Sequence, residues 1–425
     1  GALDQAYIHG FGKIGQDMGW LRLHAYWLKM RGTGRVSDRF ADYSINTAAA
    51  YQNRFMVPRP DMTKSPLREI AYAYHFDAGL YARYLRRHAE ALGVARTEGT
   101  VREVGLRAED GFVERLVLEN GAVVSGDLFL DCTGMRGLLI EDTLKTGLED
   151  WSHWLPCDRA VAAPCAYGGD KRTQMTPYTR SVARPAGWQW RIPLQHRIGN
   201  GHVYASRHMS DDEACAILMR HLDGEALAEP RLIPFRTGRR RKMWSRNVVA
   251  IGLAGGFMEP LESTSIHLVQ SGLLRLINLF PDSGFSETAR DAYNAQSRFE
   301  YERIRDFLIA HYHLNGRDEP MWRACRDMAI PDSLKARLDL FRASGRFFKD
   351  ADELFADESW IQVLLGQGLI SDACDPFVDL YDDEAKTAYL NNIRDVIRSC
   401  VAGMPNHADY IAAHCAAETE TTSCA

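Results

Sequence analysis

Residues 255–270 bring two carboxylates, three hydroxyl groups and the start of an apolar helix into one short stretch. Glu259 and Glu262 stand three positions apart, and residues 263–265 are Ser, Thr and Ser. The first amides of a helix have no intrahelical partner and carry the positive end of the helix dipole. Such a helix start favours binding of an anion or of the electron-rich edge of a cofactor.

The same residues also fit a purely structural interpretation. Ser and Thr are ordinary N-caps in front of an apolar helix, and Glu in the first turn is favoured by the helix dipole alone. These residues alone therefore do not distinguish helix capping from ligand binding.

The neighbouring elements would aim this helix at a ligand. Residues 247–252 predict a short buried strand, followed by a glycine turn, an acidic elbow (residues 255–264) and a helix over 265–280. In this order the helix N-terminus faces whatever lies beyond the strand.

Upstream, the chain alternates between helix and strand. Asp77 caps a predicted helix over 78–92, and a hairpin over 115–125 turns at Asn120-Gly121 with a type I′ signature. Residues 127–134 predict a buried strand that ends in a small-residue turn. This succession resembles the second half of a nucleotide-binding flavoprotein domain, so the expected fold class is α/β. Further helices are predicted over 17–29, 286–312, 333–343, 351–365, 383–400 and 405–417, and a sheet layer over 151–246.

Composition narrows the classes of function. The 425 residues are 46% hydrophobic, which allows a large core in two or three domains. The 51 basic and 56 acidic residues give a net charge of −5, and no extended basic stripe indicates nucleic acid. The dense basic run at 238–242 is expected to be a solvated surface turn.

Nine cysteines, including Cys424, are scattered without a Cys-x-x-Cys pair, so we interpret them as reduced thiols and predict no metal site. No apolar run approaches the about 18 residues that span a bilayer, and no signal peptide opens the sequence. These features indicate a cytoplasmic protein without a membrane segment.

Three separated motifs match one family. They are Trp188-x-Trp190-x-Ile192-Pro193, Gly256-Phe257-x-Glu259-Pro260-Leu261-Glu262-Ser263-Thr264, and His9-Gly10-Phe11-Gly12. Together they resemble the flavin-dependent halogenases of the tryptophan halogenase family, over most of the chain. The resemblance implies a Rossmann-type FAD-binding domain, as in flavoprotein monooxygenases, formed by residues 1–150 and 247–281. It also implies a β-sheet substrate layer over 151–246 and a helical substrate region over 282–425.

The family's reaction defines the expected cofactor and partners. Reduced FAD and oxygen give a flavin hydroperoxide, a halide attacks it, and hypohalous acid travels to an electron-rich arene such as an indole. The resemblance therefore implies reduced FAD, chloride or bromide, an aromatic small molecule and a separate flavin reductase, and it allows a homodimer.

The resemblance assigns roles to individual residues. Glu262 matches the glutamate that orients the oxidant or accepts the proton lost from the ring. The amides of Thr264 and Ser265 match the halide site, where the family often has Gly in place of Ser265. Trp188 and Trp190 match tryptophans that stand between flavin and substrate, although two tryptophans on one strand face are more often core residues.

The remaining implied site residues fall into two groups. Those expected around the substrate are His9, Phe11, Ile192, Pro193, Glu259 and Trp360. Those expected to contact the cofactor are Val101, Asp131, Cys132, Thr133, Gly134, Gly252, Leu253, Ala254, Gly255 and Ser263.

The start of the sequence departs from the family. Members begin with a strand leading into Gly-x-Gly-x-x-Gly and carry a lysine before the His-x-Phe-Gly segment, whereas His9 stands almost at the first residue here. That part would include a βαβ unit of about 30 residues that holds the pyrophosphate. We therefore expect an incomplete FAD domain, from a fragment or a degenerate paralogue, and no halogenation by this chain alone.

The substrate clamp departs as well. Tryptophan-specific members grip the amino acid with a tyrosine pair, a glutamate and a Phe-Trp pair ahead of a Ser-Asn-Tyr-Tyr run. Aligning that run on residues 355–360 puts Ser344-Gly345 at the tyrosines and Ala356 at the stacking tryptophan. We therefore expect an indole or another electron-rich arene rather than free tryptophan.

Two other interpretations stay open. A flavin monooxygenase that hydroxylates arenes shares the fold, although it has no reason to keep the Trp188/Trp190 motif together with Glu262. A non-catalytic flavin- or arene-binding remnant is the third, and the absent N-terminal segment motivates it.

Overall fold

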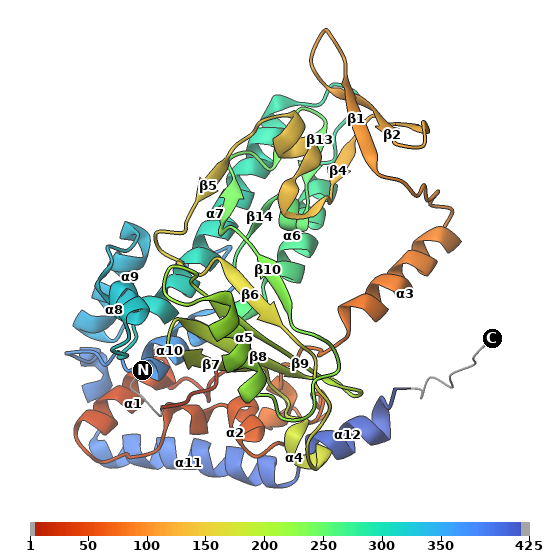
Figure 1. Cartoon of the computed structure of the whole chain (residues 1–425). Helices are drawn as coiled ribbons and strands as arrows, with labels where there is room; N and C mark the ends of the chain where they lie inside the picture. Colours follow the sequence, from red (N-terminus) through yellow and green to blue (C-terminus); the bar gives the residue numbers. More distant parts are fainter. Residues whose placement is uncertain (1–4, 418–425) are drawn as a thin grey trace.

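Residues 5–417, which this computed structural model describes, form small sheets flanked by helices (Figure 1). The helices are α1 Leu23–Gly32, α2 Ile45–Tyr51, α3 Ala78–Ala91, α4 Lys171–Gln174, α5 Asp211–Arg220, α6 Ser265–Asn278, α7 Glu287–His313, α8 Pro320–Asp327, α9 Asp332–Ser344, α10 Asp357–Gly366, α11 Asp383–Ala402 and α12 His407–His414. The strands are β1 Val101–Leu106, β2 Val113–Leu118, β3 Val123–Ser125, β4 Phe129–Asp131, β5 Leu148–Asp150, β6 Arg159–Ala162, β7 Arg180–Arg184, β8 Gly187–Pro193, β9 Ile198–Tyr204, β10 Arg231–Pro234, β11 Gly238–Arg240, β12 Trp244–Ser245, β13 Val248–Ala250 and β14 Gly256–Phe257. The mixed α/β class is thus confirmed.

The largest of these sheets is antiparallel and has the order β10-β6-β9-β8-β7. Below it in Figure 1, α11 packs against α1 and α2. The remaining strands form three-stranded sheets with the orders β1-β2-β3, β14-β11-β5 and β12-β13-β4. None of the helices within 5–417 has the length and apolar content needed to cross a bilayer.

The pairing of β4 with β13 decides where a ligand can approach. These strands are parallel, with Phe129 opposite Val248 and Asp131 opposite Ala250. The carboxyl ends of parallel strands meet at one edge, and ligands of open α/β sheets bind outside that edge. Here the edge is closed by a hydrogen bond of 3.0 Å from the Ile251 amide to the Asp131 carbonyl. The turns predicted after both strands therefore lie side by side.

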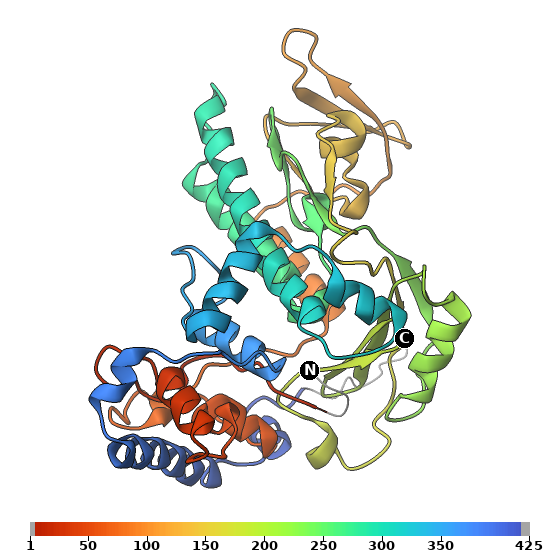
Figure 2. The ribbon, with the colours of Figure 1, turned by 90° about the vertical axis from the view of Figure 1, so that its left-hand side faces the viewer.

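The long helix α7 connects this edge to the opposite half of the molecule. It has 27 residues, which corresponds to about 40 Å. Figure 2 shows it beside α6 at one end and reaching toward α9 and α10 at the other, in agreement with the contacts between these helices. Side chains from this one rigid helix therefore reach both the edge beside α6 and the region of α9 and α10.

Most predicted elements are present, with corrected ends. The Asp77 carboxylate caps α3 by accepting from the Gly79 and Leu80 amides, as expected. The helix predicted over 17–29 begins only at Leu23, because the Asp17 carboxylate accepts from the Leu23 amide. The helix predicted over 351–365 begins at Asp357, as this buried carboxylate is held by the Lys349 amide.

The type I′ prediction for the hairpin turn is wrong. A type I′ turn needs positive φ at both central residues, and only Gly121, at 84°, has it; Asn120 does not. The Asn120 side chain instead accepts a hydrogen bond of 3.0 Å from the Ala122 amide, which favours a different turn.

The basic run at 238–242 is only partly the solvated turn that we expected: Arg241 and Lys242 are exposed, but the first two arginines are not. Arg239 and Arg240 lie on β11 and are only 5% and 6% exposed. Carboxylates on neighbouring segments pair with them, Glu149 at 2.6 Å from Arg239 and Glu141 at 3.0 Å from Arg240. Paired charge is what makes this burial tolerable.

Arg240 also joins the two turns at the ligand edge. Its guanidinium donates 3.1 Å to the Ala254 carbonyl and 3.0 Å to the Met135 carbonyl. These carbonyls belong to the short helices Gly252–Ala254 and Gly134–Arg136, which follow β13 and β4. One buried side chain therefore fixes the spacing between them.

Replacing Arg240 with Met should lower the free energy of unfolding by about 2–4 kcal/mol, because two buried carbonyls and Glu141 lose their partner. Urea unfolding measures the change. The matched control is Arg236→Met: this side chain is 74% exposed and pairs with Asp150 at 3.2 Å, so its loss should change stability by less than about 1 kcal/mol. Equal effects of both substitutions would contradict the structural role of Arg240.

Candidate active site

The Glu262 carboxylate lies between two imidazoles. His9 Nδ1 is 2.9 Å from Oε2, and His311 Nε2 is 3.0 Å from Oε1. The three side chains are 12%, 9% and 14% exposed for His9, His311 and Glu262. His9 comes from the N-terminal coil and His311 from α7. The carboxylate therefore joins three distant segments of the chain.

This arrangement keeps Glu262 ionised. Burial alone would raise its pKa, but the charges and hydrogen bonds of His9 and His311 outweigh burial and hold the pKa of Glu262 well below its usual range. His311 Nδ1 also lies 2.9 Å from the Phe307 carbonyl. Both ring nitrogens of His311 thus lie within hydrogen-bond distance of an oxygen, which fixes the orientation of the ring.

Aromatic rings surround the His9 side of the carboxylate. The His9 ring lies 5.4 Å from Phe307 and 6.1 Å from Phe355, and these two phenyl rings stack at 3.8 Å. Trp360 is fully buried and packs edge-on against Phe307 at 4.8 Å. Phe11 is 54% exposed, so the structure does not enclose it in this cluster.

The tryptophan motif lies on β8 as the alternation predicts. Trp188 and Trp190 are two residues apart and their rings are 6.1 Å from each other. Ile192 continues the same face, whereas Pro193 ends the strand and is buried. Opposite Trp190 stands Gly201, where an added Cβ would lie 2.0 Å from the indole. The neighbouring strand thus leaves room for the large ring only because it has glycine there.

Glu259, the other carboxylate of the elbow, has the opposite environment. It is 1% exposed, and no hydrogen bond of good geometry reaches its oxygens from the described part of the chain. Burial raises the pKa of Glu259 to about 7, against opposing contributions from Tyr312, Trp188 and Cys157. Glu259 therefore interacts with the tryptophan strand β8 and not with the two imidazoles that contact Glu262.

The turn after β4 is built around Asp131. Its buried carboxylate accepts from the Thr133 amide at 3.0 Å and from the Leu139 and Ile140 amides at 2.8 Å each. Cys132 is exposed, and nothing occupies the space beside Gly134, whose φ is +74°. Asp131 thus shapes the turn, and the open side at Gly134 permits close approach of a ligand.

A cavity of about 340 Å³ lies where this turn meets the turn after β13. Among its lining residues are Arg136, Arg236, Leu253 and Phe257. Apolar walls with cationic side chains at the edge fit part of a cofactor that has both a flat ring system and phosphates. Val101 belongs to the separate β1-β2-β3 sheet and does not line this cavity.

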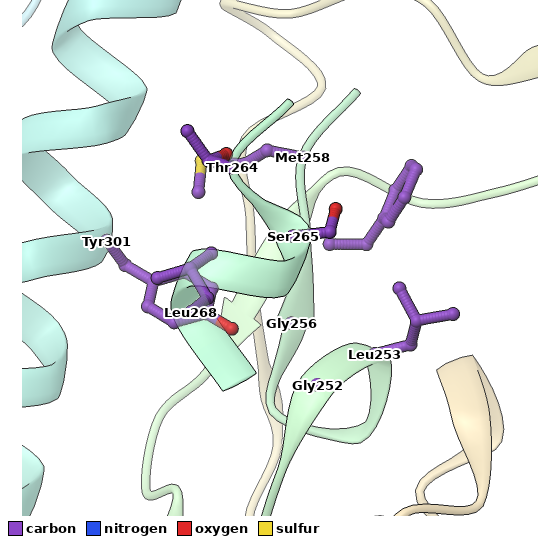
Figure 3. A pocket seen from close by; sticks show the side chains of 9 residues that line it. Gly252, Leu253, Gly256, Met258, Thr264, Ser265, Leu268 and Tyr301 are labelled. Atoms are coloured by element: carbon purple, nitrogen blue, oxygen red, sulfur yellow. The ribbon is translucent and has the colours of Figure 1, made fainter. Parts of the chain in front are cut away.

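A second, smaller cavity of about 10 Å³ adjoins the start of α6 (Figure 3). Thr264 and Ser265 line it, together with Gly252, Gly256 and Tyr301. The Thr264 side chain makes no capping hydrogen bond, so the capping interpretation is wrong at this position. Ser263, just before it, has a left-handed φ of 54°, a strained conformation of the kind that clusters at functional sites.

The glycines near the N-terminus do not form a phosphate-binding site. Gly10, Gly12 and Gly15 have the intervals of Gly-x-Gly-x-x-Gly, but they lie in coil. The Gln362 side chain holds both the Gly10 amide, at 3.1 Å, and the Gly10 carbonyl, at 3.0 Å. Gly10 is thus held in place next to His9, and its amide is not free to bind a ligand.

Comparison with known proteins agrees with this geometry. Residues 1–383 match the family model described as tryptophan halogenase. The chain belongs to the tryptophan halogenase family. It is 36% identical to tryptophan 6-halogenase ThaL of Streptomyces albogriseolus over 79% of its own length and 63% of that relative's, so it spans less than two thirds of that relative.

Two solved structures of flavin-dependent halogenases are also similar. BrvH of Brevundimonas sp. BAL3 has a TM-score of 0.93 and 47% identity, covering 96% of this chain and 82% of BrvH. Xcc4156 of Xanthomonas campestris has a TM-score of 0.92 and 45% identity, covering 97% of this chain and 81% of Xcc4156. The expected flavoprotein monooxygenase-like fold with a Rossmann-type FAD domain is therefore confirmed.

Several side chains of this family member were missed by the sequence analysis. His311, Phe307 and Tyr301 all lie on α7, and Phe355 lies just before α10. The i, i+4 spacing of Phe307 and His311 shows that they share a face, but nothing in the spacing indicates which distant residue that face meets. Phe355, and not Ala356, is the residue that reaches the aromatic cluster.

Glu259→Gln should remove a pH dependence of stability in this halogenase-family chain. The folded-state pKa of about 7 exceeds that of an unfolded Glu, about 4.3. The folded chain therefore binds an extra proton between these values, and the free energy of unfolding falls as pH rises from about 4 to about 7. Gln carries no titrating proton, so this contribution should vanish.

Urea unfolding between about pH 5 and about pH 8 measures that slope. The control is Glu384→Gln, on the exposed first turn of α11, which should keep the wild-type slope. An unchanged slope in the Glu259→Gln protein would mean that the buried carboxyl is not protonated on folding.

Proposed function

We propose that the chain is an FAD-dependent halogenase that chlorinates or brominates an electron-rich arene such as an indole. The observation that carries the proposal is the Glu262 carboxylate, held ionised between His9 and His311 beside stacked aromatic rings. The family membership supports the same reaction class.

The turns at 131–134 and 252–255 would hold the cofactor, with the cavity between them as the seat of its ring system. Bound reduced FAD supplies, together with oxygen, the two-electron oxidation that turns halide into hypohalous acid. The Thr264 and Ser265 amides would hold the halide beside it. A separate reductase would supply the reduced flavin.

The oxidant must then cross to the arene. Tyr301 lines the small cavity. His311, ten positions after Tyr301 on α7, contacts Glu262. Tyr301 and His311 are about 15 Å apart along the helix axis, but Glu262 comes only two residues before Thr264, which keeps the Cα atoms of these two residues within about 7 Å. A small neutral oxidant that diffuses over this short path fits the arrangement.

At Glu262 the reaction is an electrophilic substitution: the arene carbon bonds to the halogen of hypohalous acid, the halogen–oxygen bond breaks, and the ring proton and hydroxide leave as water. Glu262 would accept the ring proton. Its lowered pKa makes it a weak base, which suffices because an arenium ion is a very strong acid. The two imidazoles keep the carboxylate fixed toward the ring.

The substrate is proposed to lack an amino-acid head group. Two cationic side chains near the aromatic cluster already form ion pairs within the protein and so do not offer a partner to a substrate carboxylate. Arg22 pairs with Asp357, and Arg337 pairs with Glu353. Gly345, aligned with a clamp tyrosine, has its carbonyl bound by His24 at 2.9 Å. Identity is also higher to BrvH and Xcc4156 than to the tryptophan 6-halogenase.

A cytoplasmic location is part of the proposal. The eight cysteines within residues 5–417 are unpaired, and Cys424 lies outside the described residues. Unpaired thiols fit a reducing compartment, which is also where a reductase would find reduced nicotinamide.

Replacing Glu262 with Gln should lower kcat at least about 100-fold, because the base for the ring proton is lost. The assay uses the full-length protein as its gene encodes it, with FAD, a flavin reductase, bromide and indole, and detects bromoindole by mass. Glu384→Gln serves as the control with wild-type activity. A halide-independent product heavier by one oxygen would instead establish arene hydroxylation and contradict the proposal.

Indole and free L-tryptophan should be distinguished by the same enzyme. With no clamp for the ammonium and carboxylate, L-tryptophan should show no saturation where indole does, and its halogenation should not be restricted to one ring position. Initial rates against concentration, with product analysis by chromatography, decide this. Saturable halogenation of L-tryptophan at a single position would contradict the proposed substrate class.

A further inference from the structure

Tyr301 stands out among the residues around the small cavity because its hydroxyl has no protein partner. The side chain is 4% exposed, and no hydrogen bond engages its oxygen anywhere in residues 5–417. Figure 3 shows it reaching from α7 toward Gly256 and the start of α6. Its hydroxyl oxygen is not among the fully enclosed polar atoms without a partner, and the residue lines the cavity. A ligand in the cavity can therefore accept a hydrogen bond that no protein group accepts.

Two glycines beside Tyr301 leave room for its ring because they carry no side chain. A Cβ on Gly256 would lie 2.8 Å from the tyrosine ring, and one on Gly255 would lie 3.6 Å from its hydroxyl oxygen. Glycines at both positions thus let the phenol approach the turn that follows β13. The hydroxyl and the start of α6 then border the same cavity.

The phenol is suited to donate a hydrogen bond to an anion. Burial raises the pKa of Tyr301 above its usual value, and Glu300 raises it further. The Glu300 carboxylate itself points to other partners, His267 at 2.8 Å and Arg275 at 2.8 Å. The group therefore stays protonated and neutral, and its neighbouring carboxylate does not accept its proton.

We propose that the Tyr301 hydroxyl donates to the halide in the cavity at the start of α6, as a further donor beside the Thr264 and Ser265 amides, and helps to set the preference between chloride and bromide. This inference rests on the proposed halogenase function. Chloride has the higher charge density and is the stronger hydrogen-bond acceptor. Loss of the hydroxyl should therefore weaken chloride binding more than bromide binding.

The test is Tyr301→Phe, which removes one oxygen that makes no hydrogen bond within residues 5–417 and so should leave the fold intact. A hydrogen bond to a charged group corresponds to about a 10- to 100-fold change in affinity. We expect the KM for chloride to rise at least about 10-fold, the KM for bromide to rise less, and kcat at saturating halide to stay near the wild-type value. The matched control is Tyr293→Phe, on the same helix, whose hydroxyl donates to the Gly272 carbonyl at 3.3 Å outside the cavity; its halide KM should not change.

A second measurement does not require turnover. Halide binding to the FAD-loaded protein is followed by the rise in thermal unfolding midpoint with added chloride or bromide. A smaller rise in Tyr301→Phe than in Tyr293→Phe supports the inference even if no halogenated product forms, in which case only the proposed function fails. Equal halide KM values and equal midpoint shifts in the two variants would overturn the role of Tyr301, while wild-type halogenation would leave the proposed function intact.

Discussion

The ion pairs of Glu262 with two imidazoles are the interaction on which the site depends. An ionised carboxylate removed from water is very unfavourable unless polar partners bind it, and His9 and His311 do so, one at each carboxylate oxygen. This requirement constrains the positions of distant parts of the fold. The N-terminal coil must be held in place, which the Gln362 side chain does at Gly10, and α7 must lie in the register that directs His311 inward.

The two carboxylates of the elbow show how local packing separates chemical roles. Glu259 and Glu262 are three residues apart, yet burial without hydrogen-bond partners raises the pKa of Glu259, while two imidazoles lower that of Glu262. A short helix, Pro260–Glu262, begins directly after Glu259 and ends at Glu262, so that the two acidic side chains face different neighbours. One acid is thus suited to hold the tryptophan strand without charge and the other to act as a base.

Prediction from sequence succeeded where the signal was local. The buried strand at 248–250, the glycine turns and the alternation of Trp188 and Trp190 all follow from patterns within a few residues. The strand predicted as buried over 127–134 is present at 129–131, but only alternate residues are buried, and Leu130 is 43% exposed. The burial of Arg239 and Arg240 could not be predicted in this way, because it depends on carboxylates from segments that are distant in sequence. His311, Tyr301 and Phe355 were missed for the same reason: a helical period gives the face of a side chain, but the residue across from that face is set by tertiary packing.

Helix α7 explains why such distant partners can be positioned together. A single rigid helix carries Tyr301 at the small cavity and His311 at the carboxylate, so the spacing of these two side chains is set by the helical rise and not by flexible loops. Both side chains meet the same short segment of chain, because His311 contacts Glu262 and the cavity that Tyr301 lines also includes Gly256 and Thr264. In the proposed reaction the halide site and the base would therefore lie on the same short stretch of chain, residues 262–265, and α7 would supply one side chain to each. Under that proposal a substitution at Tyr301 can change halide affinity while His311 still holds the Glu262 carboxylate.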